Sequence, residues 1–208
     1  MKIHIITALI LTALISGCST SNLLTSTEPQ QTIYTLRPVS PMGAPSNIAA
    51  RVVEIASPSL PPAMDGERIA LHLNNGQKLD YYASARWSAS LGFIIQDFTR
   101  RSASAVLPYV VAVTSDQQID ADYRLQIKVN EFQPVYKEDI TAAPLLKVNV
   151  EFTLIRLPSD QIVSSFTLAK QDQLQENRLD QITVGLERLL QEIQQEAFTK
   201  IDSRLTAK

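Results

Sequence analysis

Thiols are nearly absent from this chain, which has one cysteine, Cys18, in 208 residues. A lone cysteine near the start cannot form a disulfide within the chain or a cysteine-based metal site. The fold must therefore be stabilised by its hydrophobic core. A domain spanning residues 33–208 is long enough to bury roughly 70% of the surface of its unfolded chain, so it needs no such crosslink.

The sequence also has no excess of positive charge. Without residues 1–17 the sequence has 18 Lys+Arg against 21 Asp+Glu, and the pI of the whole chain is about 5.7. Such a chain offers no basic field to attract a phosphate backbone, so nucleic acid is not expected as a partner.

The motifs of common active sites are missing as well. Downstream of the start, His72 is the only histidine, and the six glycines form neither a Walker loop nor a dinucleotide fingerprint. No Gly-x-Ser-x-Gly elbow is present. The acidic pairs Asp120/Asp122 and Glu138/Asp139 fall in loops or at a strand start, where solvated carboxylates are expected. We predict no enzymatic activity, with no catalytic, cofactor-binding or metal-binding residues.

An export signal occupies the first residues. Lys2 gives a positive start, Ile3 to Ile15 form an apolar run, and Ile-Ser-Gly precedes Cys18. The run is shorter than the ~20 residues that a membrane-spanning helix needs. The order of residues is similar to a bacterial lipobox, which predicts a signal peptide at 1–17 and lipid attachment at Cys18. A buried structural cysteine is the alternative, but nothing around this position resembles a folded segment.

Residues 18–32 are polar and without period, which predicts a flexible tether with a root-mean-square reach of about 20 Å. Three acyl chains on Cys18 would make release from the membrane negligible. By similarity to the sorting rules of Gram-negative bacteria, Ser19 in place of aspartate favours the periplasmic face of the outer membrane.

Alternating apolar and polar residues predict several strands after the tether. The clearest are Tyr123 to Asn130 and Leu146 to Leu154, and a turn at Pro158-Ser159-Asp160 leads into a further strand. Shorter strands are expected at 33–37, 50–55, 69–73 and 109–113. One wet face on each clear strand is typical of an antiparallel sheet covered on a single side.

Two amphipathic helices are expected to cover that sheet. Trp87 heads the first apolar stripe, with Ser84 as N-cap and an Asp97/Arg101 ion pair on the polar face. The second stripe runs from residue 182 to residue 201, with Asn177 as cap and Gly185 as a point of close packing against the sheet. The predicted fold is a single α+β domain, a mostly antiparallel sheet with two helices on one face.

Several short motifs, taken in order, resemble the ABC-type transport auxiliary lipoprotein family, also described as PqiC-like. They are Tyr34-Thr35-Leu36, the turn from Pro61 to Ile69, Tyr82 through Arg86-Trp87 at the expected start of the first helix, Asp122-Tyr123-Arg124-Leu125, and the closing helix. The Pro61-Pro62 turn departs from the family's commoner form. The resemblance implies an accessory of an ABC-type or PqiAB-like transport system, with an MCE-domain periplasmic protein as partner and phospholipid as cargo.

Two loops with apolar side chains are candidates for contact with a partner. Leu60 and Met64 lie in the proline turn, and Tyr136 and Ile140 lie between Pro134 and Pro144. Loops on a rigid sheet often bind partners, but such side chains can equally fold back onto the core. Trp87 is better explained by core packing than by function. Three other roles remain open at this stage: a carrier that holds an acyl chain between sheet and helices, a lipoprotein that regulates cell-wall synthesis, and an envelope hydrolase.

Overall fold

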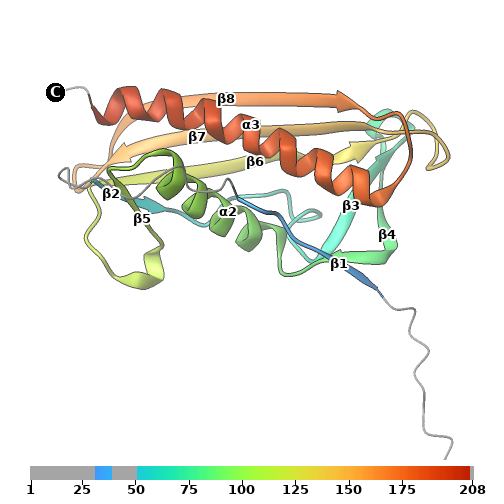
Figure 1. Ribbon diagram of the computed structural model, residues 1–208, viewed down its shortest axis with the longest axis horizontal. Coiled ribbons are helices and arrows are strands. Elements are labelled where there is room, and N and C mark those ends of the chain that lie inside the picture. The colour runs from blue at the N-terminus through green and yellow to red at the C-terminus, as the bar shows by residue number, and fades with distance from the viewer. Residues whose placement is uncertain (1–30, 39–50, 207–208) are drawn as a thin grey trace, which may run out of the picture. The chain divides into compact units, whose positions relative to one another are not determined.

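Eight strands form one mixed sheet in the computed structural model, which describes residues 31–38 and 51–206 (Figure 1). Cys18, the signal peptide and most of the predicted tether lie outside the described residues. The strands are β1 (Thr32–Tyr34), β2 (Arg51–Ile55), β3 (Arg68–Leu73), β4 (Lys78–Trp87), β5 (Val110–Val113), β6 (Tyr123–Val135), β7 (Leu145–Arg156) and β8 (Gln161–Gln173). The helices are α2 (Leu91–Val106) and α3 (Leu179–Leu205), with short 3-10 turns η1 (Asn74–Gly76) and η2 (Ser115–Gln117).

The long strand β6 organises the sheet. Along one edge it pairs antiparallel with β7, which pairs antiparallel with β8. Its other edge is shared: β2 pairs parallel with the first residues of β6, and β3 meets the far end, where His72 is opposite Val135. The predicted α+β fold is confirmed, but the sheet is mixed, because β1 and β4, β2 and β5, β2 and β6, and β3 and β6 all run parallel.

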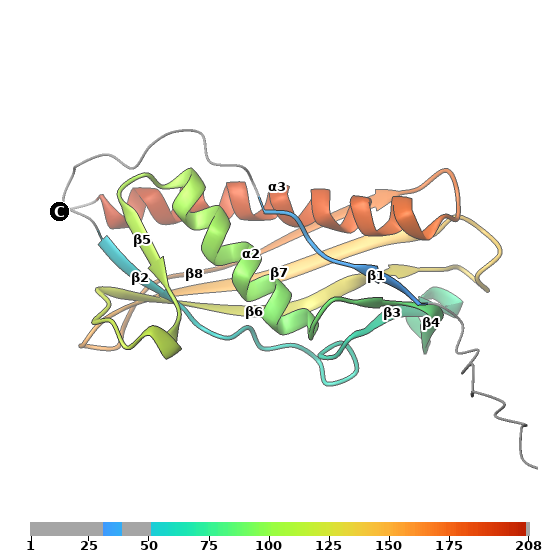
Figure 2. The same cartoon turned by 60° about the horizontal axis from the view of Figure 1, so that its bottom comes forward.

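Both helices lie on one side of the sheet. Figure 2 shows α3 running along β7 and β8, while α2 lies beside β5 and crosses the face at an angle to α3. Ser90 caps α2, because its side chain accepts a hydrogen bond from the backbone N–H of Phe93 at 3.4 Å. On the polar face of α2, the predicted ion pair is confirmed, with Arg101 Nη1 3.5 Å from Asp97 Oδ2.

The start of the first helix was predicted too early. Residues 78–87 form strand β4, so Ser84 and Trp87 belong to a strand, and Ser84 is not the N-cap. Trp87 ends β4 opposite Tyr34 and is 1% exposed, so it packs in the core as the apolar stripe indicates. The Tyr82 to Trp87 motif therefore lies in strand β4, which pairs with β1 and β3, and it precedes the helix.

The second helix begins with Arg178 at the cap position, and Asn177 does not cap it. Its apolar stripe is buried against the sheet, including Ile182, Leu189 and Ile193. Gly185 is confirmed as a close-packing point, because a Cβ atom there would lie 2.4 Å from Leu146 Cδ1 of β7.

The space between helices and sheet is filled. The largest fully buried side chains include Trp87, Phe98, Phe152 and Phe198, and they belong to one continuous hydrophobic cluster. Among the residues that the structure describes, this cluster extends from Leu36 to Leu205. Neither α2 nor α3, the helices of the described region, has the length and apolar character needed to cross a membrane.

Candidate functional site

The four predicted partner contacts have different environments. Met64 is 5% exposed and Tyr136 is 1% exposed, so both side chains fold back into the domain and are not available to a partner in this conformation. Leu60 is half-buried, and Ile140 is 43% exposed. Of the four, Leu60 and Ile140 therefore remain as surface candidates.

A hydrogen-bond network around the buried Tyr136 holds the loop that carries Ile140. The hydroxyls of Tyr82 and Tyr136 lie 2.6 Å apart, and the Tyr136 hydroxyl donates to Asn177 Oδ1 at 2.7 Å. The Asn177 amide in turn donates to the Ile140 carbonyl oxygen. Burial raises the pKa of Tyr82, and its hydrogen bond with Tyr136 raises it further. This network joins β4, the end of β6 and the start of α3, so Ile140 is presented from a fixed position.

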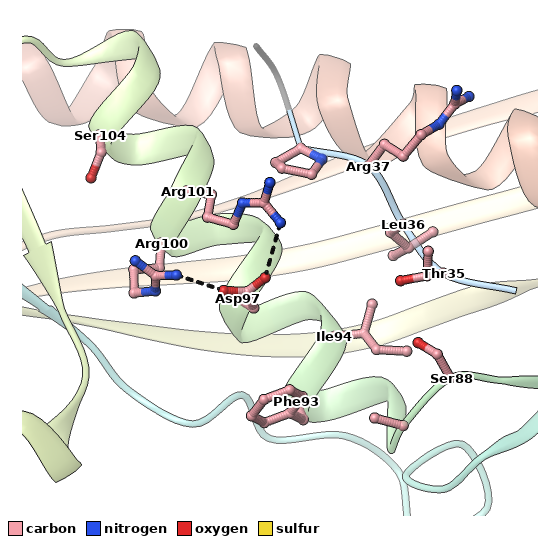
Figure 3. A pocket seen from close by; sticks show the side chains of 12 residues that line it. Thr35, Leu36, Arg37, Ser88, Phe93, Ile94, Asp97, Arg100, Arg101 and Ser104 are labelled. Atoms are coloured by element: carbon pink, nitrogen blue, oxygen red, sulfur yellow. Dashed lines mark hydrogen bonds and ion pairs between the residues drawn. The ribbon is translucent and has the colours of Figure 1, made fainter. Parts of the chain in front are cut away.

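A groove of about 610 Å³ runs beside α2 (Figure 3). One wall is the α2 face from Phe93 to Ser104, and the other is the segment from Thr35 to Pro38 that follows β1. We call this feature the α2 groove. Leu36 and Ile94 are buried at its floor, whereas Phe93 is 62% exposed.

The second wall of the α2 groove is fastened to α3. The buried Glu187 carboxylate accepts the backbone N–H of Arg37 at 2.7 Å and its guanidinium at 3.2 Å. Gln191 donates to the Arg37 carbonyl oxygen at 2.9 Å. These contacts hold the segment after β1 away from α2 and keep the groove open.

The rim of the α2 groove is cationic. Arg100 and Arg101 both bind Asp97, at 2.7 Å and 3.5 Å, so two guanidinium groups share one carboxylate. Arg37 has Glu187 as its own partner. The single negative charge of Asp97 therefore balances only one of the two positive charges that it contacts.

The described part of the chain brings together no group of three or more His, Cys, Asp or Glu side chains that would hold a metal ion. His72 is half-buried on β3. Asp122 accepts the backbone N–H of Val52 at 2.9 Å, and Asp139 accepts that of Thr141 at 2.9 Å. Two of the acidic residues singled out in the sequence, Asp122 and Asp139, therefore hold backbone segments in place by hydrogen bonds. Arg86 is paired with Glu67 at 2.7 Å.

Sequence reasoning did not find the α2 groove. Its second wall is brought to α2 by parallel pairing of β1 with β4, a contact between residues more than 50 positions apart. One local signal was present: Phe93 falls outside the apolar stripe of its helix, four to eight residues before Asp97, Arg100 and Arg101.

Solved structures with the same fold support the architecture. A crystal structure of a Xanthomonas campestris protein, assigned to family DUF330, is 21% identical with a TM-score of 0.66, and the match covers 83% of this chain and 99% of that one. A second crystal structure, of an uncharacterized protein, is 14% identical with a TM-score of 0.67 over 83% and 99% of the two chains. At these identities the likeness concerns the fold alone.

The sequence itself matches a family model. Residues 34–197 match the ABC-type transport auxiliary lipoprotein component, and the match extends from β1 into α3. A comparison with curated proteins gives no match. Because the family model covers most of the domain, the chain belongs to the family of ABC-type transport auxiliary lipoproteins.

Proposed function

We propose that this protein is a non-catalytic accessory of an ABC-type lipid transport system, anchored through Cys18 to the periplasmic face of the outer membrane. Its domain docks onto an MCE-domain periplasmic protein and helps the lipid pathway reach that membrane. Membership of the auxiliary lipoprotein family supports an accessory role. The lipobox and the polar tether support the anchor.

The filled core is the observation that favours docking over carriage of lipid inside the domain. Ile182, Leu186 and Leu190 of α3 are 0% exposed, as are Val150 and Phe152 of β7 beneath them. An acyl chain between helices and sheet would have to displace these side chains, because protein interiors are packed about as densely as organic crystals. The surface is therefore where the domain acts.

Leu60 and Ile140 are the proposed contacts with the partner. Both are loop residues fastened to the sheet by neighbouring bonds: Ser59 accepts from and donates to β6, and Asn177 holds the Ile140 carbonyl. Rigid presentation lowers the entropy that ordering would cost on binding.

In-cell photo-crosslinking tests this proposal. A photoreactive residue at position 60 or 140 should capture an MCE-domain protein, and the same residue at Gln171, an exposed position on the opposite face of the sheet, should not. Failure to capture any MCE-domain protein from either loop, with the chain acylated and folded, would contradict docking.

A further inference from the structure

The last strand of the sheet, β8, has an open outer edge. It pairs with β7 alone, and no other strand of the described region lies on its far side (Figure 1). An antiparallel edge strand directs the N–H and C=O groups of alternate residues outward, where they can pair with a further strand. The register of β8 with β7 is regular from Ser164 to Gln173, so this part of the edge is open to strand addition.

The devices that usually protect an edge strand are absent from this part of β8 or neutralised. Natural edges are blunted by proline, bulges or charged side chains. The segment contains no proline, and its two charges are paired with α3. Lys170 Nζ lies 3.8 Å from Glu196 Oε2, and Asp172 Oδ2 lies 2.6 Å from Arg188 Nη2. Neither charge is therefore left to repel an approaching strand.

A row of charged residues on α3 runs beside this edge. The members follow one another at four-residue spacing, so they are neighbours along the helix: Glu192, Glu196, Lys200 and Arg204. Glu196 binds Lys170 of β8, and Lys200 Nζ lies 6.0 Å from the centre of the Phe166 ring. The middle of the row therefore lies beside β8. We call these four residues the α3 row.

The α3 row is complementary to itself when two copies of the helix lie antiparallel. Glu196 of one copy then faces Lys200 of the other, and Glu192 faces Arg204. A parallel arrangement would place like charges opposite each other, so the row favours one orientation. The centre of the antiparallel arrangement is at Phe198, midway along the row.

The strand has the same centre. The contacts of the α3 row with Phe166 and Lys170 map its centre onto Leu168, midway between them. A two-fold axis at Leu168 would place Phe166 opposite Lys170 of the second copy, and Thr167 opposite its Ala169. The pairing would extend over residues 164–172, and no like charges in this range would be opposite each other.

We propose that two copies of this chain associate through their β8 edges, as an antiparallel pair of strands about a two-fold axis at Leu168. The two sheets would join into one, with both α3 helices on the same face. Neighbouring strands lie about 4.8 Å apart and α3 lies over β7 and β8, so the two helix axes would be about 10 Å apart, a normal packing distance. This inference goes beyond the proposed docking and uses neither Leu60 nor Ile140.

Disulfide crosslinking of the full-length protein in cells tests the pairing of the strands. A chain with Thr167→Cys and Ala169→Cys would place cysteines opposite each other across the axis. Opposite residues of an antiparallel pair have Cα atoms about 4.5 to 5.5 Å apart, within the range for a disulfide. Mild oxidation should therefore join two chains. The control, Asn149→Cys with Glu151→Cys, has the same spacing and pairs with the same two residues from β7, one strand further from the axis, so it should stay monomeric.

Two charge variants in the same cysteine background test the α3 row. Lys200→Glu places Glu196 opposite a glutamate of the second copy, and Glu196→Lys places Lys200 opposite a lysine, so each variant alone should lose most of its crosslinked dimer. When the two are expressed together with tags of different mass, the mixed dimer should form, because its facing charges are again opposite. Each variant also lacks the Glu196–Lys200 ion pair of its own helix, which mixing cannot restore. Recovery in the mixture would therefore report contact between chains.

Three results would overturn the proposal. Absence of the crosslinked dimer, or an equal yield from the β7 control, would exclude pairing of the β8 edges. Dimer that neither charge variant reduces, or that the mixture does not restore, would exclude the two-fold axis at Leu168. Capture of a different protein by a photoreactive residue at position 167, in place of a second copy, would assign the edge to a strand of another partner. Docking through Leu60 and Ile140 is tested at other positions, so these results would leave it unaffected.

Discussion

Replacing Gly185 with alanine should destabilise the domain, although the same change stabilises most helices. Gly185 lies inside α3, where alanine would be favoured by about 1 kcal/mol on helix propensity. Here, however, the added methyl group would lie 2.4 Å from Leu146 Cδ1, and Leu146 is 0% exposed, so its side chain is enclosed by the core. Overpacking of this kind costs about 1 to 3 kcal/mol.

The two terms leave a net loss of about 1 kcal/mol in the free energy of unfolding. For a domain of this length, that lowers Tm by roughly 2 to 4 °C. A second substitution, Leu146→Ala, should reverse the sign. It costs about 2 to 5 kcal/mol alone because it opens a cavity. In its background Gly185→Ala fills part of that cavity and should stabilise by about 1 kcal/mol.

Urea unfolding, followed by circular dichroism, measures the free energy of unfolding of all four proteins of this double-mutant cycle, each made as a soluble fragment that begins at Ser19. The predicted coupling between positions 185 and 146 is about 2 kcal/mol. If Gly185→Ala stabilised the wild-type domain, the contact between α3 and β7 would be loose. An acyl chain could then fit between the helices and the sheet.

Further predictions concern the hydrogen bonds that hold the two surface features. Tyr82→Phe should cost about 1 kcal/mol in urea unfolding, because the Tyr136 hydroxyl loses one partner; no loss would contradict the network. Glu187→Gln should accelerate hydrogen exchange at the Arg37 amide about tenfold, and unchanged exchange would mean that the groove wall is held otherwise. Burial raises the pKa of Tyr82 and of Tyr109 above 10. The tyrosines of the unfolded chain therefore lose their protons at lower pH than those of the folded domain. Their contribution to the free energy of unfolding should be constant below pH 10 and should fall above pH 10; a rise above pH 10 would refute the burial.

Local pattern predicted the elements whose burial repeats along the chain. In β7, Leu146, Val148 and Val150 face the core while Lys147 and Asn149 are half-buried on the other face, so a period of two is visible in the sequence. The stripe of α3 is equally regular. Gly185 was predicted as a close-packing point because it lies on this apolar face, where a glycine allows a neighbouring element to approach closely.

Strand β4 was not predicted because its last residues fit the apolar spacing of the helix that follows it. Trp87 stands at helical spacing from Leu91, Ile94 and Phe98, and two serines, Ser84 and Ser90, offer alternative caps. The residues Asn74-Asn75-Gly76 before it are typical of a hairpin turn, a signal that the sequence prediction did not use. In the structure all three have positive φ and connect β3 to β4. Parallel pairing is set by contacts between distant residues, so neither the mixed sheet nor the α2 groove follows from local pattern.

Contacts between distant residues also decide which of the predicted partner contacts are buried. Met64 and Tyr136 lie in loops with turn residues, and the sequence does not show which apolar loop side chain has a pocket to enter. The structure supplies one for each, and Tyr136 also gains hydroxyl partners from Tyr82 and Asn177.

The membrane anchor is the central claim of the proposed function, because a domain that docks through its surface loops would need to be held beside its partner. Mass spectrometry of the protein isolated from cell envelopes tests this directly. We predict an N-terminal peptide that begins at Cys18 and has three acyl chains. A peptide that retains residues 1–17 and an unmodified Cys18 thiol would contradict the account.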